Sequence, residues 1–322
     1  MHPSSAPSPR PVLVVKSGGQ QAVADWQKLF AEFSPALEVR GWDDPEVDPA
    51  SVEYALVWQP QAGRLARYPR LRAVLSSSAG VDHILCDPLL PEALPIVRMV
   101  PEETQQRMAE FIGMSCLLLQ KGFPQMLAQQ RNRHWREIVA TRLASEVRVG
   151  IMGLGALGAQ AARYVRTLGF QVCGWSQTRK SISGVCSYAG AQELADFLAG
   201  TDILVCLLPD TQATRGIVDA ALLAHLPRGA SLINVGRGAH VVEPDLLAAL
   251  DSGQLASAVL DVFEQEPLDA ASAFWAHPQV IVTPHSAATP SRREKARQAA
   301  QAIAAMTRGE PPSHLLDRTR GY

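Results

Sequence analysis

The stretch Val149-Gly150-Ile151-Met152-Gly153-Leu154-Gly155-Ala156-Leu157-Gly158 decides the fold of this chain. An apolar run is followed by three glycines with the spacing G-x-G-x-x-G, and a helical pattern continues over 157–168. This order is typical of a dinucleotide-binding unit: Gly153 permits a tight turn, Gly155 lets a pyrophosphate approach the backbone, and Gly158 allows close helix packing. An ordinary glycine-rich turn is the alternative, and the flanking strand and helix disfavour it. Leu154, Ala156 and Leu157 complete the predicted cofactor loop.

Around this loop, apolar runs recur at intervals that suit alternating strands and helices. They cover 147–152, 171–175, 202–207, 231–234, 256–260 and 280–283. Six such strands predict a doubly wound parallel sheet.

An earlier alternation predicts a second, smaller α/β domain. Its strands are expected at 12–15, 55–58, 73–75 and 95–97, with a helix at 21–33. Two further helices, at 102–120 and 291–306, are expected to cross between the two domains. The fold expected is therefore α/β, with two doubly wound Rossmann/flavodoxin-like domains and the active site in the cleft between them. Residues 11–100 and 290–322 are predicted to form the substrate-binding domain and 101–289 the dinucleotide-binding domain. Residues 1–10, rich in Pro and Ser, are predicted to be disordered.

Composition narrows the function classes. The chain has thirty Lys and Arg and thirty-one Asp and Glu. The net charge of −1 therefore creates no overall positive field that would attract nucleic acid or an anionic membrane. No apolar run approaches the roughly 18 residues of a membrane span, and 1–11 lacks a signal-peptide pattern, so we expect a cytoplasmic protein. The five scattered cysteines predict reduced thiols rather than disulfides, and no metal site is expected.

The end of the second strand of the larger domain indicates which dinucleotide fits. NAD sites usually carry Asp or Glu there, about 20 residues after the glycines, whereas this chain has Ser176 followed by Arg179 and Lys180. A hydroxyl and two cations can bind a 2′-phosphate, so the sequence predicts a preference for NADP(H) over NAD(H). The alternative is that the two cations belong to an ordinary solvated loop.

Two further strand ends carry groups suited to reduction of a 2-oxo acid. Arg237 stands between two glycines, which we expect to let the backbone turn sharply so that its guanidinium can bind a carboxylate. His285 follows the last strand and is the expected proton donor. Among the other histidines only His83 is a second-rank candidate.

These motifs, in this chain order, resemble the D-isomer-specific 2-hydroxyacid dehydrogenases, and within them the bacterial NADPH-dependent glyoxylate/hydroxypyruvate reductase branch. The resemblance implies that Glu266 is the acidic partner of His285, which would orient the imidazole and raise its pKa. It also implies a homodimer formed through the larger domain, with Trp135 as a possible contact residue. Residues expected by the same resemblance to border the cofactor are Leu208, Pro209, Thr214, Val235, Gly236 and Asp261.

For Pro209 and Thr214 a purely structural reading stays open, namely a strand end followed by a helix cap at Thr211 or Thr214. For Asp261 the alternative is a turn acid at a strand end. The resemblance further assigns substrate binding to a loop at Ala79, Gly80 and Val81, and to Trp58, for which core packing is the alternative. Two features depart from the family pattern: the polar run Ser76-Ser77-Ser78 before the substrate loop, and Gly236 in place of Ala.

The leading hypothesis is therefore an enzyme that reduces a small 2-oxo acid, such as glyoxylate or hydroxypyruvate, with NADPH. A different class is a non-catalytic dinucleotide sensor or corepressor on the same fold. A formate-type dehydrogenase is disfavoured because Glu266 would be needless where no proton is transferred.

Overall fold

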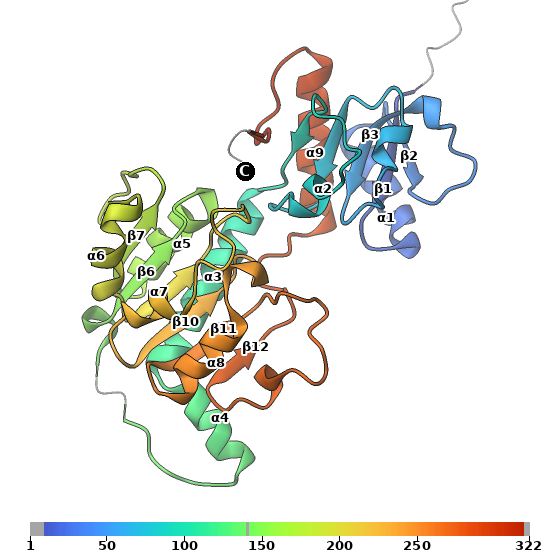
Figure 1. Ribbon diagram of the computed structural model, residues 1–322. Coiled ribbons are helices and arrows are strands. Elements are labelled where there is room, and N and C mark those ends of the chain that lie inside the picture. Colours follow the sequence, from blue (N-terminus) through green and yellow to red (C-terminus); the bar gives the residue numbers. More distant parts are fainter. Residues whose placement is uncertain (1–9, 140–141, 319–322) are drawn as a thin grey trace, which may run out of the picture. The chain divides into compact units, whose positions relative to one another are not determined.

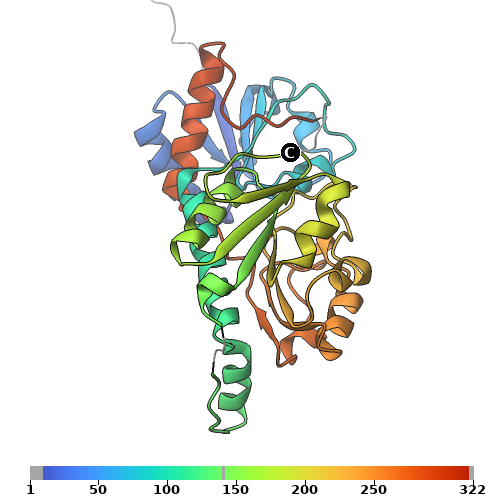
Figure 2. The same ribbon diagram turned by 90° about the vertical axis from the view of Figure 1, so that its left-hand side faces the viewer.

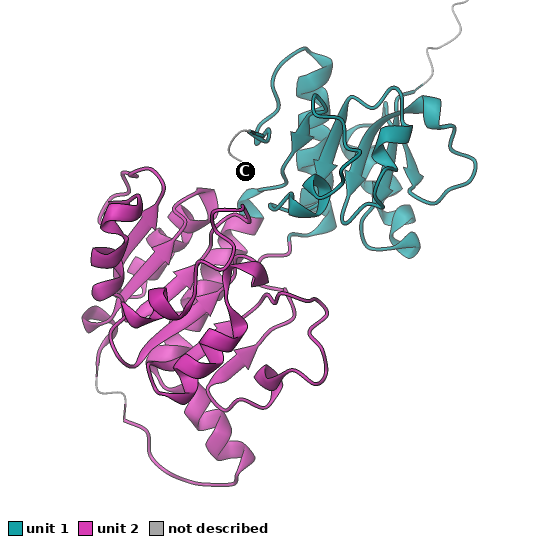
Figure 3. Cartoon of the chain, viewed as in Figure 1, with its two compact units in different colours: residues 1–103, 290–322 teal, residues 104–289 magenta. Residues whose placement is uncertain are grey.

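The computed structural model describes residues 10–139 and 142–318. The chain divides into two compact units, residues 1–103 with 290–322 (unit 1) and residues 104–289 (unit 2) (Figure 3). The sequence places the corresponding divisions at 100/101 and 289/290. The segment 1–10, predicted to be disordered, lies outside the described residues except for the exposed Arg10.

Unit 1 is built on a five-stranded parallel sheet with the strand order β2-β1-β3-β4-β5 (Figure 1). This is the flavodoxin-like order of doubly wound folds. One strand, β2, is absent from the sequence prediction, because its residues Glu38-Val39-Arg40-Gly41 alternate between buried and half-buried positions at a sheet edge instead of forming an apolar run. The strands are β1 (Val12–Lys16), β2 (Glu38–Gly41), β3 (Val52–Val57), β4 (Ala73–Ser76) and β5 (Ile96–Val97).

Helices α1 (Val23–Phe33) and α9 (Arg292–Thr307) pack together in unit 1. Trp26 and Phe30 of α1 share one buried cluster with Ala299 and Ile303 of α9. The small residues of α9 let the two helices approach closely, so this C-terminal helix completes the core of the N-terminal sheet. A third helix, α2 (Asp82–Leu85), follows β4.

Unit 2 contains a seven-stranded parallel sheet with the order β12-β11-β10-β9-β6-β7-β8. Counted from β6, this is the Rossmann order 3-2-1-4-5-6 with one strand added. The expected α/β fold with two parallel sheets is confirmed, but the prediction of six strands is wrong by one, because β8 lies at the edge and has no apolar run. The strands are β6 (Arg148–Met152), β7 (Gln171–Ser176), β8 (Cys186–Ala189), β9 (Ile203–Cys206), β10 (Ala230–Asn234), β11 (Leu255–Leu260) and β12 (Val280–Val282).

Helices cover both faces of this sheet (Figures 1 and 2). On one face, α3 (Glu102–Gln120) and α5 (Ala156–Thr167) contribute to a single buried cluster, and Gly113 of α3 lets the Tyr164 ring of α5 approach. The other face is covered by α6 (Leu194–Ala199), α7 (Ala220–Ala224) and α8 (Glu243–Asp251). The remaining helix, α4 (Phe123–Arg131), follows α3.

The order of strands brings the predicted functional segments together. β6 and β9 are neighbours although β7 and β8 lie between them in sequence, and this switch point is where doubly wound sheets bind ligands. All pairings are parallel, so the segments after β6, β9, β10, β11 and β12 leave the same edge of the sheet. No helix among the described residues is long and apolar enough to cross a membrane.

Candidate active site

The glycine turn after β6 has the geometry that its spacing predicts. Gly153 has φ of +104°, and a Cβ there would lie 2.4 Å from the Leu207 carbonyl oxygen. Gly155 is exposed and faces open space, so its backbone is accessible to a ligand. A Cβ at Gly158 would lie 1.8 Å from the Gly153 carbonyl oxygen. The third glycine therefore lets α5 pack against the turn itself.

At the end of β7, the structure gives the predicted 2′-phosphate ligands other partners. The Ser176 hydroxyl donates to the Thr178 carbonyl (2.8 Å), and the Arg179 guanidinium pairs with the Glu193 carboxylate and donates to the Ser187 carbonyl. The backbone N–H of Lys180 donates to the Ser187 hydroxyl (3.1 Å). Arg179 is exposed, so a phosphate can reach it by displacing Glu193.

Arg237 follows β10, and the two glycines beside it allow neighbouring residues to approach the backbone closely. The backbone bends at Gly236 and enters a 3-10 turn at Gly238, and neither glycine has a positive φ. A Cβ at Gly238 would lie 1.8 Å from the Phe263 carbonyl carbon, and one at Gly236 would lie 2.8 Å from the His240 ring. Gly238 thus lets the segment after β10 touch the backbone of the segment after β11.

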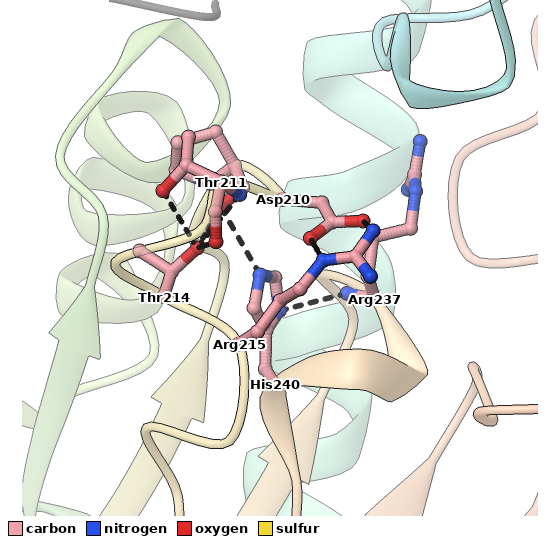
Figure 4. A network of polar contacts seen from close by, with 7 residues as sticks. Asp210, Thr211, Thr214, Arg215, Arg237 and His240 are labelled. Carbon is pink, nitrogen blue, oxygen red and sulfur yellow. Dashed lines mark hydrogen bonds and ion pairs between the residues drawn. The ribbon is translucent and has the colours of Figure 1, made fainter. Parts of the chain in front are cut away.

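His240, one of the histidines to which the sequence assigns no role, is a structural residue of this site. Its Nδ1 accepts a hydrogen bond from the Arg237 backbone N–H (3.0 Å), so its ring hydrogen lies on Nε2, 3.1 Å from the Pro209 carbonyl oxygen (Figure 4). That carbonyl also accepts from the Thr214 hydroxyl (2.6 Å). The fully buried imidazole therefore ties the predicted cofactor segment after β9 to the Arg237 segment.

The alternative of a helix cap at Thr211 or Thr214 is wrong. These residues form a turn in which the Thr211 N–H donates to the Thr214 hydroxyl (2.9 Å). The next helix, α7, is capped by Asp219, whose carboxylate accepts from the Leu222 N–H (2.8 Å).

Glu266 and His285 form a hydrogen-bonded pair. His285 Nδ1 lies 2.7 Å from Glu266 Oε2, and Glu266 Oε1 accepts from the Phe263 N–H (3.0 Å). Partial burial by itself raises the pKa of Glu266, but the hydrogen bonds from His285 and Phe263 and the charges of His285 and Arg237 hold that pKa below its usual value. An ionised carboxylate only accepts hydrogen bonds, so Nδ1 of His285 carries a hydrogen and donates it to Glu266.

Asp261 braces the segment that carries His285. Its carboxylate accepts hydrogen bonds from the Thr283 hydroxyl (2.6 Å), the Ser286 N–H (2.9 Å) and the Ala287 N–H (3.0 Å). Its carbonyl accepts from the His285 N–H (2.8 Å), and His285 itself has a left-handed backbone with φ of 50°. Only 2% of Asp261 is exposed, so the acid holds a turn in which a non-glycine residue is strained. Its predicted cofactor contact stays a prediction.

In unit 1, the predicted substrate residues lie at the ends of neighbouring parallel strands. Trp58 follows β3 and is half-buried, and the segment Ala79-Gly80-Val81 follows β4. Ser76 and Ser78 both donate to the Gly80 carbonyl (2.8 Å each). His83 is buried beside them. Within the described ranges no group of three or more His, Cys, Asp or Glu side chains could hold a metal ion.

A family model described as "D-isomer specific 2-hydroxyacid dehydrogenase, NAD binding domain" matches residues 114–287. The chain belongs to this family. It is 41% identical over 302 residues to glyoxylate/hydroxypyruvate reductase A of Klebsiella pneumoniae (strain 342), covering 92% of this chain and 96% of that protein. The corresponding protein of Serratia proteamaculans (strain 568) is 40% identical over 303 residues, with the same coverage. These matches confirm the resemblance found in the sequence.

Solved structures of this family agree with the fold. A D-isomer specific 2-hydroxyacid dehydrogenase from Xanthobacter autotrophicus Py2, in complex with NADPH and MES, has a TM-score of 0.92 and 42% identity, covering 98% of this chain and 100% of that one. An NADPH-dependent glyoxylate/hydroxypyruvate reductase from Sinorhizobium meliloti, in complex with NADP and sulfate, has a TM-score of 0.89 and 40% identity, covering 97% and 99%. This chain is thus an oxidoreductase of the 2-hydroxyacid dehydrogenase family.

Replacing Asp261 tests its bracing role. Asp261→Asn keeps the shape of the side chain but places an NH₂ group opposite N–H or O–H donors whose hydrogen bonds the carboxylate accepts. The free energy of unfolding should therefore fall by about 1–3 kcal/mol. The melting temperature should fall by about 2–10 °C, as measured by differential scanning fluorimetry. Asp196→Asn, at an exposed position of α6, is the matched control and should melt like the unchanged protein. Equal melting temperatures for the two variants would contradict the assignment.

Proposed function

We propose that this protein reduces a small 2-oxo acid, glyoxylate or hydroxypyruvate, to the corresponding 2-hydroxy acid with NADPH. The observation that carries the proposal is the Glu266–His285 pair at the edge of the sheet from which the Arg237 segment also leaves, with Arg237 close enough to lower the pKa of Glu266. A cation, a proton donor and an acidic partner are the groups that this reduction requires. The names of the similar reductases support the choice of substrate.

Each residue of the pair and the arginine has a distinct role in this proposal. Arg237 binds the substrate carboxylate and carbonyl oxygen, which orients C2 and stabilises the negative charge that develops on the oxygen. His285, as an imidazolium, donates its Nε2 proton to that oxygen, while its Nδ1–H stays hydrogen-bonded to Glu266. Glu266 remains ionised and keeps the ring in the orientation and tautomer that proton transfer needs. Hydride addition at C2 and protonation of the oxygen give the 2-hydroxy acid.

The residues after β6 fit a dinucleotide. Gly155, the residue before α5, offers no side chain to cap the helix, so the first N–H groups of the helix are accessible to a pyrophosphate. NADPH, when bound, supplies the hydride. Ser176, Arg179 and Lys180 would hold the 2′-phosphate, and Leu208, Pro209, Thr214, Val235 and Gly236 would border the cofactor. NADPH and NADP in the similar solved structures support the preference for the phosphorylated dinucleotide.

The homodimer belongs to the proposal as well. The segment around α4 exposes large apolar side chains: Phe123 is 41% exposed, Val139 69% and Trp135 100%. An open groove on the same unit is lined by Gly113, Met114, Leu117, Tyr164 and Leu168, among others. Since the Trp135 side chain is fully exposed, a second copy of the chain can bury this segment and the groove together in a self-complementary twofold contact. A cytoplasmic location stays a prediction.

Initial rates of NADPH oxidation with glyoxylate, hydroxypyruvate and pyruvate test the reaction. Arg237→Ala should lower kcat/KM by about 10²–10³-fold, because it removes the charge that stabilises the developing alkoxide, and His285→Ala should lower it by about 10²–10⁴-fold. Arg228→Ala, before β10 at the opposite edge of the sheet, is the control and should keep full activity. Cofactor binding without turnover of any acid would favour the dinucleotide sensor instead.

A second experiment tests the cofactor assignment. Arg179→Ala should raise the KM for NADPH about tenfold or more and leave the KM for NADH unchanged, because only NADPH has the 2′-phosphate. Glu193→Gln should lower the KM for NADPH, since it removes the carboxylate that now pairs with Arg179. If each variant changes the KM for NADPH and the KM for NADH by the same factor, Arg179 does not contact the 2′-phosphate.

Light scattering after size-exclusion chromatography tests the dimer. Trp135→Ser should weaken self-association by at least about 30-fold, as expected for an aromatic side chain buried at the centre of an interface. Leu89→Ser provides the control, because Leu89 is a 64% exposed apolar residue of unit 1. A Trp135→Ser protein that remains dimeric at the same dilution would disprove the proposed contact.

A further inference from the structure

Unit 1 contains a buried histidine that the proposed reaction does not use. His83 lies on α2 and is 9% exposed. Its Nδ1 is 3.1 Å from the backbone nitrogen of Gln59, and its Nε2 is 3.3 Å from the Ser76 hydroxyl oxygen and 3.4 Å from that of Ser78. The ring thus lies between the segment after β3 and the segment after β4.

The hydrogen bonds assign one tautomer to this ring. A backbone N–H can only donate, so Nδ1 must be the acceptor and the hydrogen of the neutral imidazole lies on Nε2. Nε2–H then donates toward the two serine hydroxyls, and each hydroxyl donates its own hydrogen to the Gly80 carbonyl (2.8 Å each). The bonds therefore run in one direction, from Gln59 through the imidazole and the serines to Gly80.

This arrangement orients the backbone of the predicted substrate loop. The Gly80 carbonyl is held by the two serines, and the Ala79 carbonyl accepts from Arg98 Nε (2.9 Å). In a trans peptide the N–H points away from the carbonyl, so the N–H groups of Gly80 and Val81 face away from these donors. Neither N–H donates a hydrogen bond within the part of the chain that the structure describes. Two adjacent amides held in this way can receive an anion.

The same imidazole supports Trp58. The two ring centroids are 4.3 Å apart, and the next residue, Gln59, has a left-handed backbone with φ of 48°. This conformation is unfavourable for a non-glycine residue, and here the bond to His83 and the bond from Lys16 Nζ to the Gln59 carbonyl (2.6 Å) maintain it. One side chain therefore holds both segments that the sequence assigns to the substrate.

We propose that His83, Ser76 and Ser78 are positioning residues, which preset the Gly80 and Val81 amides and the Trp58 ring to receive the carboxylate of a short 2-oxo acid. This inference rests on the proposed function. It gives a role to Ser76 and Ser78 of the polar run that precedes the substrate loop. That run departs from the pattern of the family. It also replaces the second-rank catalytic role of His83, because the histidine acts through the loop and the tryptophan.

The double variant Ser76→Ala/Ser78→Ala, compared with Ser77→Ala, tests the inference. Ser77 is buried like Ser76, whereas Ser78 is half-buried, and the Ser77 hydroxyl takes no part in the bonds to Gly80. The double variant should raise the KM for glyoxylate about two- to tenfold, the loss expected for a few neutral hydrogen bonds, while kcat and the Kd for NADPH stay within about twofold of the unchanged protein. Ser77→Ala should match the unchanged protein in all three quantities.

Titration calorimetry with oxalate, an unreactive two-carbon acid, on the NADP⁺-loaded protein separates this inference from the proposed reaction. The double variant and His83→Ala should bind oxalate more weakly than the unchanged protein, and His83→Gln, which keeps an N–H donor, should recover part of the loss. If no 2-oxo acid is turned over, the proposed function fails and the oxalate titration still decides this inference. Unchanged oxalate binding in the double variant, no oxalate binding by the unchanged protein, or an equal rise in the Kd for NADPH would overturn it.

Discussion

The candidate site depends on the hydrogen bonds that the Asp261 carboxylate accepts from the segment after β12. They hold His285 in a left-handed conformation that a histidine does not favour, and so bring its ring to Glu266. Because the acid is almost fully buried, an unpaired oxygen would be costly, which makes the arrangement specific. The position of the Glu266–His285 pair therefore depends on a buried acid that belongs to the segment after a neighbouring strand.

A second constraint is close backbone approach at the carboxyl edge of the sheet. Gly238 packs on the backbone of Phe263, and Gly153 on that of Leu207, at distances that no Cβ would allow. These contacts join segments from neighbouring strands, so the Arg237, Glu266 and cofactor segments form one surface. His240 adds a side-chain bridge between Pro209 and the Arg237 backbone. The rigidity of the site thus comes from groups that carry no part of the proposed chemistry.

Two neutral histidines, His83 and His240, show why residue type alone does not identify a catalytic group. Each accepts a backbone N–H at Nδ1, which assigns its tautomer and leaves Nε2–H to donate to another segment. His285 differs because its Nδ1 meets a carboxylate. The sequence separates it from the others only through its place after a strand and through the family pattern. Each of the other two also bonds to a segment that is distant along the chain, at Gln59 for His83 and at Pro209 for His240, and these contacts are set by packing.

Much of the fold follows from local sequence. The G-x-G-x-x-G turn after an apolar strand, the long helix α3 and the alternation of strands and helices lead to two parallel sheets, because these patterns reflect local sterics and continuous burial. The edge strands β2 and β8 could not be predicted from these patterns, because they are not apolar throughout. Only the tertiary structure decides that Gly238 contacts the backbone of Phe263 and that Asp261 braces the His285 segment. It also decides that Arg179 pairs with Glu193 and that His83 joins two loops. Each of these contacts joins segments that follow different strands, and the order of strands in the sheet sets the distances between them.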